Sequence, residues 1–142
     1  MTAVRELILQ QVATLLAATS AVEIEAEAPG DPSRFPALQI FDEGQKPETG
    51  EAGTERFAML IEVNGFVEGG SGATARAARN ALYSEVVEAL LADGAFAGLA
   101  DEVEQGRLQN SVAMLAAKRR LGFSLDIVIH FATARGAPQT IN

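Results

Sequence analysis

A chain of 142 residues has the length of one domain and can bury a substantial core. With 48% hydrophobic and 21% charged residues, the composition excludes a disordered chain and a fibrous repeat. The formal net charge of -8 argues against tight binding of nucleic acid, because neutralising phosphates requires clustered lysine and arginine. The lack of cysteine excludes disulfide bonds, thiolate nucleophiles and thiolate metal ligands.

The N-terminal segment has apolar residues at the spacing of an amphipathic helix, which we expect from about Thr2 to Ala18. Thr2 is the predicted N-cap, because its side-chain oxygen can accept a hydrogen bond from the first helical turn. Glu6, Gln10 and Gln11 interrupt the apolar run, which is unlike the core of a signal peptide. We therefore expect a retained helix, and no run in the sequence is long enough to span a bilayer.

Two short strands and a polar loop are predicted next. In residues 21–28 apolar residues alternate with glutamates, which predicts a strand with one solvated face. A turn rich in proline and glycine, residues 29–32, separates it from a second strand predicted at Phe35 to Asp42. Residues 42–55 have no apolar periodicity. We predict a polar, mobile loop there, because a segment of this length without secondary structure is usually mobile or functional.

The middle of the chain has the pattern of a strand, a glycine turn and a helix. Residues from Arg56 to Val67 alternate between apolar and mixed positions, which predicts a long strand. After two glycines, an alanine-rich amphipathic helix is predicted with Ser71 as its N-cap. Gly94 stands where a glycine commonly follows the last helical turn.

Two further strands complete the predicted fold. Residues from Asp101 to Val112 are weakly patterned and are assigned to a strand, and residues 119–133 alternate as a long strand with one face on the core. The tail, residues 134–142, is expected to be frayed. The order α-β-β-β-α-β-β predicts a single α+β domain over residues 1–142. Its mostly antiparallel sheet is expected to have four to five strands, with two helices packed on one face.

One formal cofactor motif is present, since Gly70 to Ala75 matches the G-x-G-x-x-A turn of dinucleotide-binding folds. In such folds the preceding strand is buried on both faces, whereas this one carries Glu62 and Asn64, and no second parallel strand ending in an acid follows. We interpret the glycines as a flexible turn. A small nucleotide- or ligand-binding domain is kept as the remote alternative, and no P-loop motif occurs.

No group of residues predicts catalysis. His130 is the single histidine and has no recognisable metal or triad partners in the sequence, so a structural or interfacial role is expected. Acidic residues gather in two clusters, which are Glu23, Glu25 and Glu27, and Asp101, Glu102 and Glu104. Their spacing is typical of a solvated strand face. We predict no enzyme activity, no cofactor and no metal site.

Four segments resemble phage tail terminator proteins of the minor tail protein U type. They are the opening V-R-E-L-I helix (residues 4–8), F-P-A-L (35–38), the R-F-A-M-L-I-E-V strand (56–63) and the glycine-linked helix with R-N-A-L-Y (79–83). With the long terminal strand, the resemblance covers nearly all of residues 1–133. It implies that subunits form a homo-oligomeric, hexameric ring on the last ring of tail tube protein. Such a ring ends polymerisation of the tube and presents a surface to the head connector.

The resemblance also implies where the protein acts. Assembly takes place in the bacterial host cytoplasm, after which the protein occupies the head-proximal end of the virion tail, in a phage or a prophage. DNA passes through the ring without being specifically bound, and no membrane is involved. Acids on the inner wall would repel the phosphates and keep the DNA sliding. Another small head–tail connector or completion protein is the alternative. The resemblance transfers no catalytic or binding residue.

A closed ring requires a heterologous interface, in which two different patches of each subunit meet. The two candidates are the polar loop with Arg56 and the outward face of the last strand. The interface residues predicted on this basis are Glu43, Lys46, Glu48, Glu51, Glu55, Arg56, Arg119, Arg120, Asp126 and His130.

The basic run at residues 118–120 is expected to pair with acidic residues across a subunit boundary. Charge reversal of both Arg119 and Arg120 should therefore weaken self-association, which light scattering would report as a lower oligomer mass. An unchanged oligomer mass in the double variant would contradict this expectation.

Overall fold

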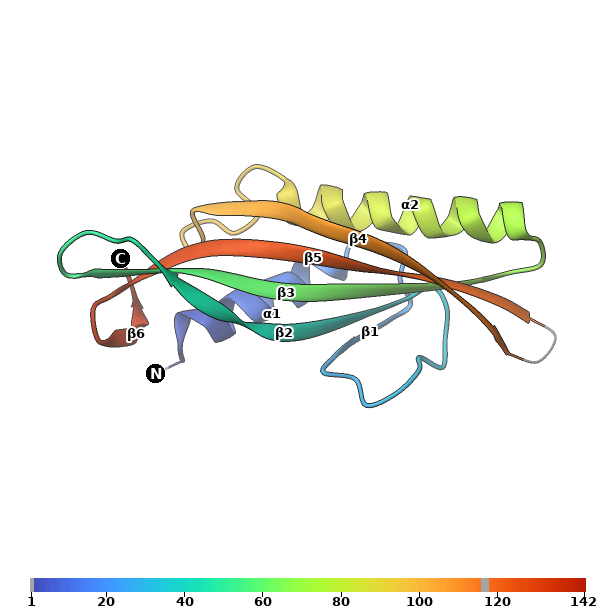
Figure 1. Ribbon diagram of the computed structural model, residues 1–142, viewed down its shortest axis with the longest axis horizontal. Helices are drawn as coiled ribbons and strands as arrows, with labels where there is room; N and C mark the ends of the chain where they lie inside the picture. The colour runs from blue at the N-terminus through green and yellow to red at the C-terminus, as the bar shows by residue number, and fades with distance from the viewer. Residues whose placement is uncertain (1, 116–117) are drawn as a thin grey trace.

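The computed structural model describes residues 2–115 and 118–142, and within them two helices pack on a six-stranded sheet (Figure 1). The helices are α1 (Val4–Leu16) and α2 (Gly72–Leu91). The strands, in chain order, are β1 (Glu23–Ala26), β2 (Ala37–Glu48), β3 (Thr54–Gly69), β4 (Glu102–Leu115), β5 (Lys118–Ala134) and β6 (Ala137–Ile141). Neither helix in this described part of the chain is long and apolar enough to cross a membrane.

The sheet has the strand order β1-β2-β3-β5-β4, and β6 pairs with β5 outside this path. The short strand β1 runs parallel to β2, and the other neighbouring strands are antiparallel. The predicted α+β class with a mostly antiparallel sheet is confirmed. The sheet has six strands where four to five were predicted, because residues 137–141 pair with β5 instead of fraying.

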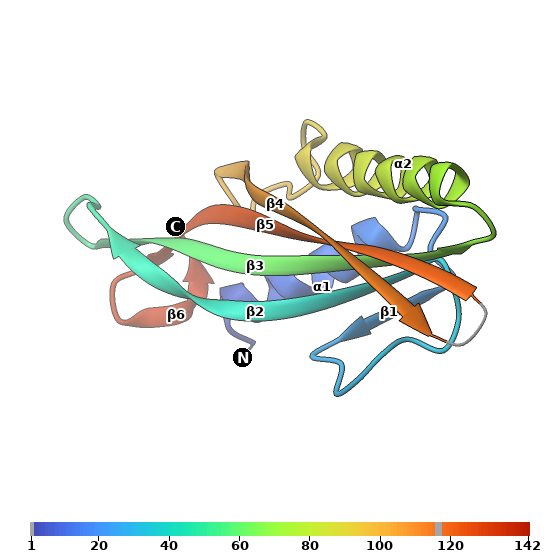
Figure 2. The same ribbon diagram turned by 45° about the vertical axis from the view of Figure 1, so that its right-hand side comes forward.

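The core lies between the sheet and the two helices. In α1 the side chains of Val4, Ile8, Val12 and Leu16 recur every fourth residue and are fully buried. They form one cluster with the buried face of α2 and with alternate residues of β3 and β5, as in the cross-strand pairs Ile61–Ile127 and Val63–Leu125. Both helices therefore cover the same face of the sheet, as predicted, and α1 passes behind the strands in both views (Figures 1 and 2).

Residues 42–55, predicted as a polar loop, instead form the ends of β2 and β3 and the turn between them. β2 continues to Glu48 and β3 begins at Thr54, with Glu48 paired to Arg56 across the hairpin. The side chains of residues 45–48 are all exposed, so this part of the hairpin buries no face. A strand that is polar on both faces has no apolar alternation, and the sequence pattern on which strand prediction depends is absent.

The helix ends were predicted with mixed success. The N-cap of α1 is Ala3, which makes no side-chain cap bond, and not Thr2. Ser71 caps α2 as predicted, and its Oγ accepts a hydrogen bond from the backbone N–H of Thr74 at 3.1 Å. Because α2 already ends at Leu91, Gly94 belongs to the following turn, where its φ of 75° favours glycine.

The outer strand β4 contains a register shift. Its pairing with β5 is irregular between Gln105 and Leu108, which is the signature of a β-bulge. At this point Gly106 lies against Asp126 of β5, and a Cβ atom on Gly106 would be 2.9 Å from that side chain. The bulge therefore needs a residue without a side chain at its centre.

Phe123 fixes the distance between the sheet and α2. Its ring lies over Gly65, the residue opposite it on β3, and meets Tyr83 of α2 edge-on with the ring centroids 6.1 Å apart. A Cβ atom on Gly65 would overlap the Cε1 and Cζ atoms of Phe123. The small residue on β3 thus provides the space that the aromatic contact occupies.

Replacing Gly65 with alanine should destabilise the protein by about 1–3 kcal/mol, because the added methyl group overpacks the core beneath Phe123. The matched control is Gly70→Ala, since nothing lies within 4 Å of a Cβ atom there. Chemical denaturation of the two variants and the parent provides the comparison. Equal midpoints for the two variants would show that Phe123 can move aside at no cost.

Candidate interaction surface

The face of the sheet opposite the helices is open toward the turn between β2 and β3, and there it carries half of the residues predicted to form an interface. Farther along β2 this face is covered, since Gln39 is buried and donates a hydrogen bond to the backbone oxygen of Gly30 at 2.7 Å. We call the open part the uncovered face. Directly opposed residues of β3 and β5 on this face include Ala58 and His130, Leu60 and Val128, and Glu62 and Asp126. The antiparallel register brings them together, since partners in such a ladder point to the same side. The strand order therefore places the polar half of β2 on the same face as the outward side chains of β5, with β3 between the two strands.

A hollow on this face unites residues from the two predicted interface segments. Its apolar floor is formed by Ala58, Leu60 and Val128, which belong to β3 and β5. Its polar rim includes four residues predicted from the sequence, which are Glu43, Lys46, Glu48 and His130, and also Glu104 of β4. The two segments were expected on opposite sides of a subunit contact, but the fold joins them into one surface.

His130 is held between carboxylates. Its Nδ1 atom lies 2.7 Å from Oε1 of Glu48, and its Nε2 atom lies 3.4 Å from Oε1 of Glu104. The hydrogen bond to Glu48, and then the negative charges of Glu48, Glu104 and Glu102, raise the pKa of His130 above its ordinary value. The protonated imidazole ring is thus favoured as a cation that bridges β2, β5 and β4.

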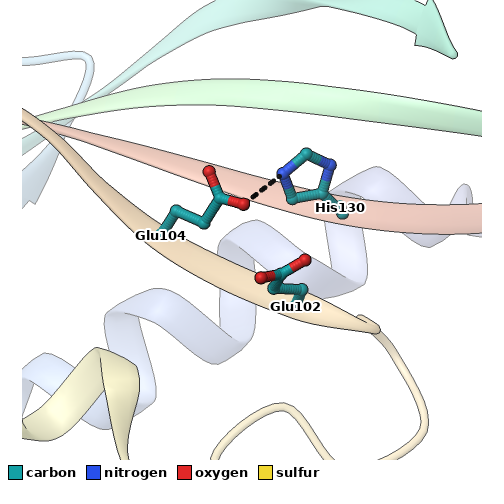
Figure 3. A group of neighbouring side chains, drawn as sticks. All are labelled: Glu102, Glu104 and His130. Atoms are coloured by element: carbon teal, nitrogen blue, oxygen red, sulfur yellow. Dashed lines mark ion pairs between the residues drawn. The ribbon is translucent and has the colours of Figure 1, made fainter.

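Glu102, Glu104 and His130 also have the donor types of a metal site. One ligand atom from each lies within 4.8 Å of the others, and Figure 3 shows the two glutamates of β4 beside the ring. An imidazole nitrogen and two carboxylates are ligands that a divalent transition metal accepts. In the described chain the same groups already contact one another, since His130 lies between Glu48 and Glu104.

The remaining acids of the uncovered face repel one another. Glu62 and Asp126 stand directly opposite each other in the ladder, and like charges in that position are destabilising. Partial desolvation and the neighbouring charges of Glu62, Glu27 and Asp126 raise the pKa of Glu43. This face therefore carries a concentrated negative charge around an apolar floor.

The other predicted interface residues have partners within the chain or lie at its ends. Arg56 pairs with Asp101 at 2.5 Å, and Glu55 accepts a hydrogen bond from the backbone N–H of Gly136 at 2.7 Å. Glu51 is exposed in the turn between β2 and β3. Their assignment to a subunit interface remains a prediction.

Arg119 and Arg120 are neighbours in sequence, but their side chains contact different parts of the chain. Arg120 lies over the ring of Phe35, 4.4 Å from its centroid, and contacts Glu68 at 3.4 Å. These contacts within the chain were not expected for a residue assigned to a subunit boundary. Arg119 instead lies beside the first turn of α2, where its Nη1 atom contacts Gly72.

The acidic clusters identified in the sequence also have local roles. Glu23 accepts hydrogen bonds from the backbone and side chain of Ser33, at 3.0 and 2.8 Å. Glu27 accepts one from the backbone N–H of Asp42 at 2.7 Å. These bonds attach the two ends of β1 to Ser33 and Asp42 of the same chain. The prediction of a solvated strand face did not include such bonds.

The glycine turn before α2 has the wrong setting for a dinucleotide. The strand before it, β3, lies between two antiparallel neighbours, whereas the dinucleotide turn belongs to a parallel β-α-β unit. Gly69 is required for close packing instead, because a Cβ atom there would lie 2.9 Å from that of Ala75. The interpretation as a strand-to-helix turn fits this environment.

Sequence reasoning missed a basic hollow at the start of α2. It is lined by Arg76 and Arg79 of α2, Arg119 of β5, Gly72, and the apolar side chains of Val112 and Leu121. The spacing of Arg76 and Arg79 on one helix face was visible in the sequence. Their proximity to Arg119 was not, because it depends on how β5 passes the first turn of α2.

Comparisons with known proteins show a similarity of fold. No protein-family profile matches the chain, and no curated protein is detectably similar to it in sequence. Among solved structures, a chain from the virion of a native gene transfer agent (GTA) particle is similar, with a TM-score of 0.52 and 17% sequence identity. The match covers 90% of this chain and 92% of that chain, so the two share the fold along almost their whole length.

Replacing His130 with glutamine should lower stability in a pH-dependent way. Because the pKa of His130 is raised in the folded state, its contribution is fully present below the unfolded value of about 6.5 and is lost as pH rises through the folded value. The difference in unfolding free energy between parent and variant should therefore be largest near pH 5.5 and smallest near pH 8.5. The pair is partly open to solvent, so we expect a change of less than about 1 kcal/mol.

Glu48→Gln should show the same pH dependence, while the exposed Glu51→Gln serves as the control and should not. Denaturant unfolding across the pH range measures all three. A difference between His130→Gln and the parent that does not vary with pH would exclude a charged His130.

Proposed function

We propose that this chain is a structural protein of a phage-like particle and acts by assembly with other virion proteins. The observation that carries the proposal is the shared fold with a chain of a gene transfer agent virion, which extends over almost all of both chains. A likeness that includes both ends favours a protein of the same general construction over a common small motif. Enzyme activity and a bound cofactor form no part of this proposal.

More specifically, we propose a tail terminator, as the segments from α1 to β5 suggested. Subunits would close into a ring, hexameric in that family, on the last ring of tail tube protein, and the ring would then receive the head connector. This would place the protein in the bacterial cytoplasm during assembly and at the head-proximal end of the tail afterwards. A head–tail connector or completion protein is the second candidate, since it would share the size and the ring symmetry and differ only in its partner.

The uncovered face of the sheet supports a position around DNA. It gathers Glu43, Glu62, Glu104 and Asp126 around an apolar floor. A wall of negative charge repels phosphates, so a polymer of DNA passes along it without being held. We propose that this face lines the channel of the ring.

The proposal is tested with purified protein and the tail tube protein from the same genome. Light scattering over a concentration series, followed by negative-stain imaging, should show that tubes stop growing and carry a ring at one end when this protein is added. If tube length does not respond at any ratio of the two proteins, the terminator assignment is wrong. Binding of the protein to the head connector in that case would favour the second candidate.

A further inference from the structure

The basic hollow beside α2 brings three arginines together on a chain whose net charge is -8. Three other arginines pair with carboxylates inside the chain, namely Arg5 with Asp42 at 2.6 Å, Arg56 with Asp101 at 2.5 Å and Arg120 with Glu68 at 3.4 Å. Among residues 2–115 and 118–142, no carboxylate lies within ion-pair distance of Arg76, Arg79 or Arg119.

Two local effects make this arrangement unfavourable in the isolated chain. Arg76 and Arg79 are three residues apart on one helix, where like charges repel. The Nε atom of Arg79 is shielded from solvent and has no hydrogen-bond partner. A negatively charged neighbour would offset both of these costs.

The centre of the hollow is apolar. Val112 of β4 is 68% exposed, the largest fraction among the exposed large hydrophobic residues of the described chain, and Leu121 lies beside it. An apolar centre with an arginine rim has the composition of a protein interface, in which arginine is enriched and often carries much of the binding energy. A protein surface with acidic residues is thus a better occupant than a small anion.

The chain itself has such a surface at its other end. The acidic hairpin end, which we define as Glu48, Glu51 and Glu55, lies at the junction of β2 and β3. In Figure 1 the turn between these strands is at the left end of the long axis, and the first turn of α2 is at the right end. The two ends are therefore opposite in charge and far apart on one molecule.

We propose that the basic hollow binds the acidic hairpin end of a second copy of this chain. The contact joins two different patches, so repetition of it leads from subunit to subunit in one direction and can close into a ring. This inference rests on the proposed assembly function and specifies which surfaces meet. From the sequence, the polar loop was expected to meet the outward face of the last strand. The proposed partner of the acidic hairpin end is instead the hollow formed by α2, β4 and β5.

DNA is the less favoured occupant. Three arginines around an exposed valine form a small patch, and nucleic-acid surfaces need extended positive charge over several phosphates. The hollow also stands away from the acidic face that would line a channel, since it lies at the start of α2 on the helix-covered side. If charge reversal of these arginines reduced DNA binding without weakening self-association, DNA would be the occupant of the hollow instead.

Site-directed cross-linking tests the contact directly, because the chain has no native cysteine. The Val112→Cys and Glu51→Cys variants are treated with a short bis-maleimide, separately and mixed, with tail tube protein present and absent. We expect a covalent dimer in the mixture and little or none in either variant alone. Dimers formed by one variant alone, with no gain on mixing, would overturn the proposal, because they require two identical patches to meet.

Charge reversal provides an independent measurement. The Arg76→Glu/Arg119→Glu and Glu51→Lys/Glu55→Lys variants should each associate about tenfold or more weakly than the parent, as expected when a central arginine contact is lost. A mixture of the two should regain the parental mass, since every contact then joins opposite charges. Arg107→Glu is the control with the same change of sign on an exposed arginine outside the hollow.

The outcomes separate this inference from the proposed function. Rings whose mass and salt dependence are unaffected by the Arg76→Glu/Arg119→Glu change would overturn the inference and leave the terminator proposal intact. A protein that stays monomeric at all concentrations, with tube protein present, would also overturn the inference. If the contact is confirmed but tube length never responds, the terminator assignment fails while the subunit contact stands.

Discussion

The pairing of β3 with β5 is the constraint on which the rest of the structure depends. Its ladder runs without a break from Thr54 and Ala134 to Gly69 and Arg119. This register places one apolar row of each strand against the helices and leaves the other row on the uncovered face. A shift by one residue would expose the core and bury Glu62 and Asp126. The position of α2, the shape of the acidic face and the place of Arg119 all follow from this one alignment.

The sequence was informative wherever one face of an element is buried. The alternation of β5 and the four-residue repeat of α1 predicted both elements, since burial on one side selects apolar residues at fixed spacing. The hairpin end of β2 and the strand β6 could not be found in this way. Their side chains are largely exposed, and their stability comes from backbone hydrogen bonds to β3 and β5, which leave no pattern in the side chains.

Prediction of the candidate surface was limited by a different cause. From the sequence, Glu48 and His130 were predicted as interface residues in two separate segments. Their ion pair joins β2 and β5, which are not consecutive in the chain and are separated by β3 in the sheet. The arginines of α2 were overlooked because a lone pair of arginines on a helix is common on any surface. Only the passage of Arg119 beside Gly72 turns them into a cluster, and that depends on long-range pairing.

The bulge in β4 bears on how this molecule can avoid uncontrolled polymerisation. β4 is an open margin of the sheet, where unpaired backbone groups invite a strand of another molecule to continue the ladder. The shift at Gly106 twists that margin, and the charges of Glu102, Glu104 and Arg107 surround it, so a straight strand finds no continuous template. The contacts between copies that we propose would instead be made by side chains. Such contacts have a fixed geometry and can end with a closed number of subunits, whereas the addition of strands has no natural stopping point.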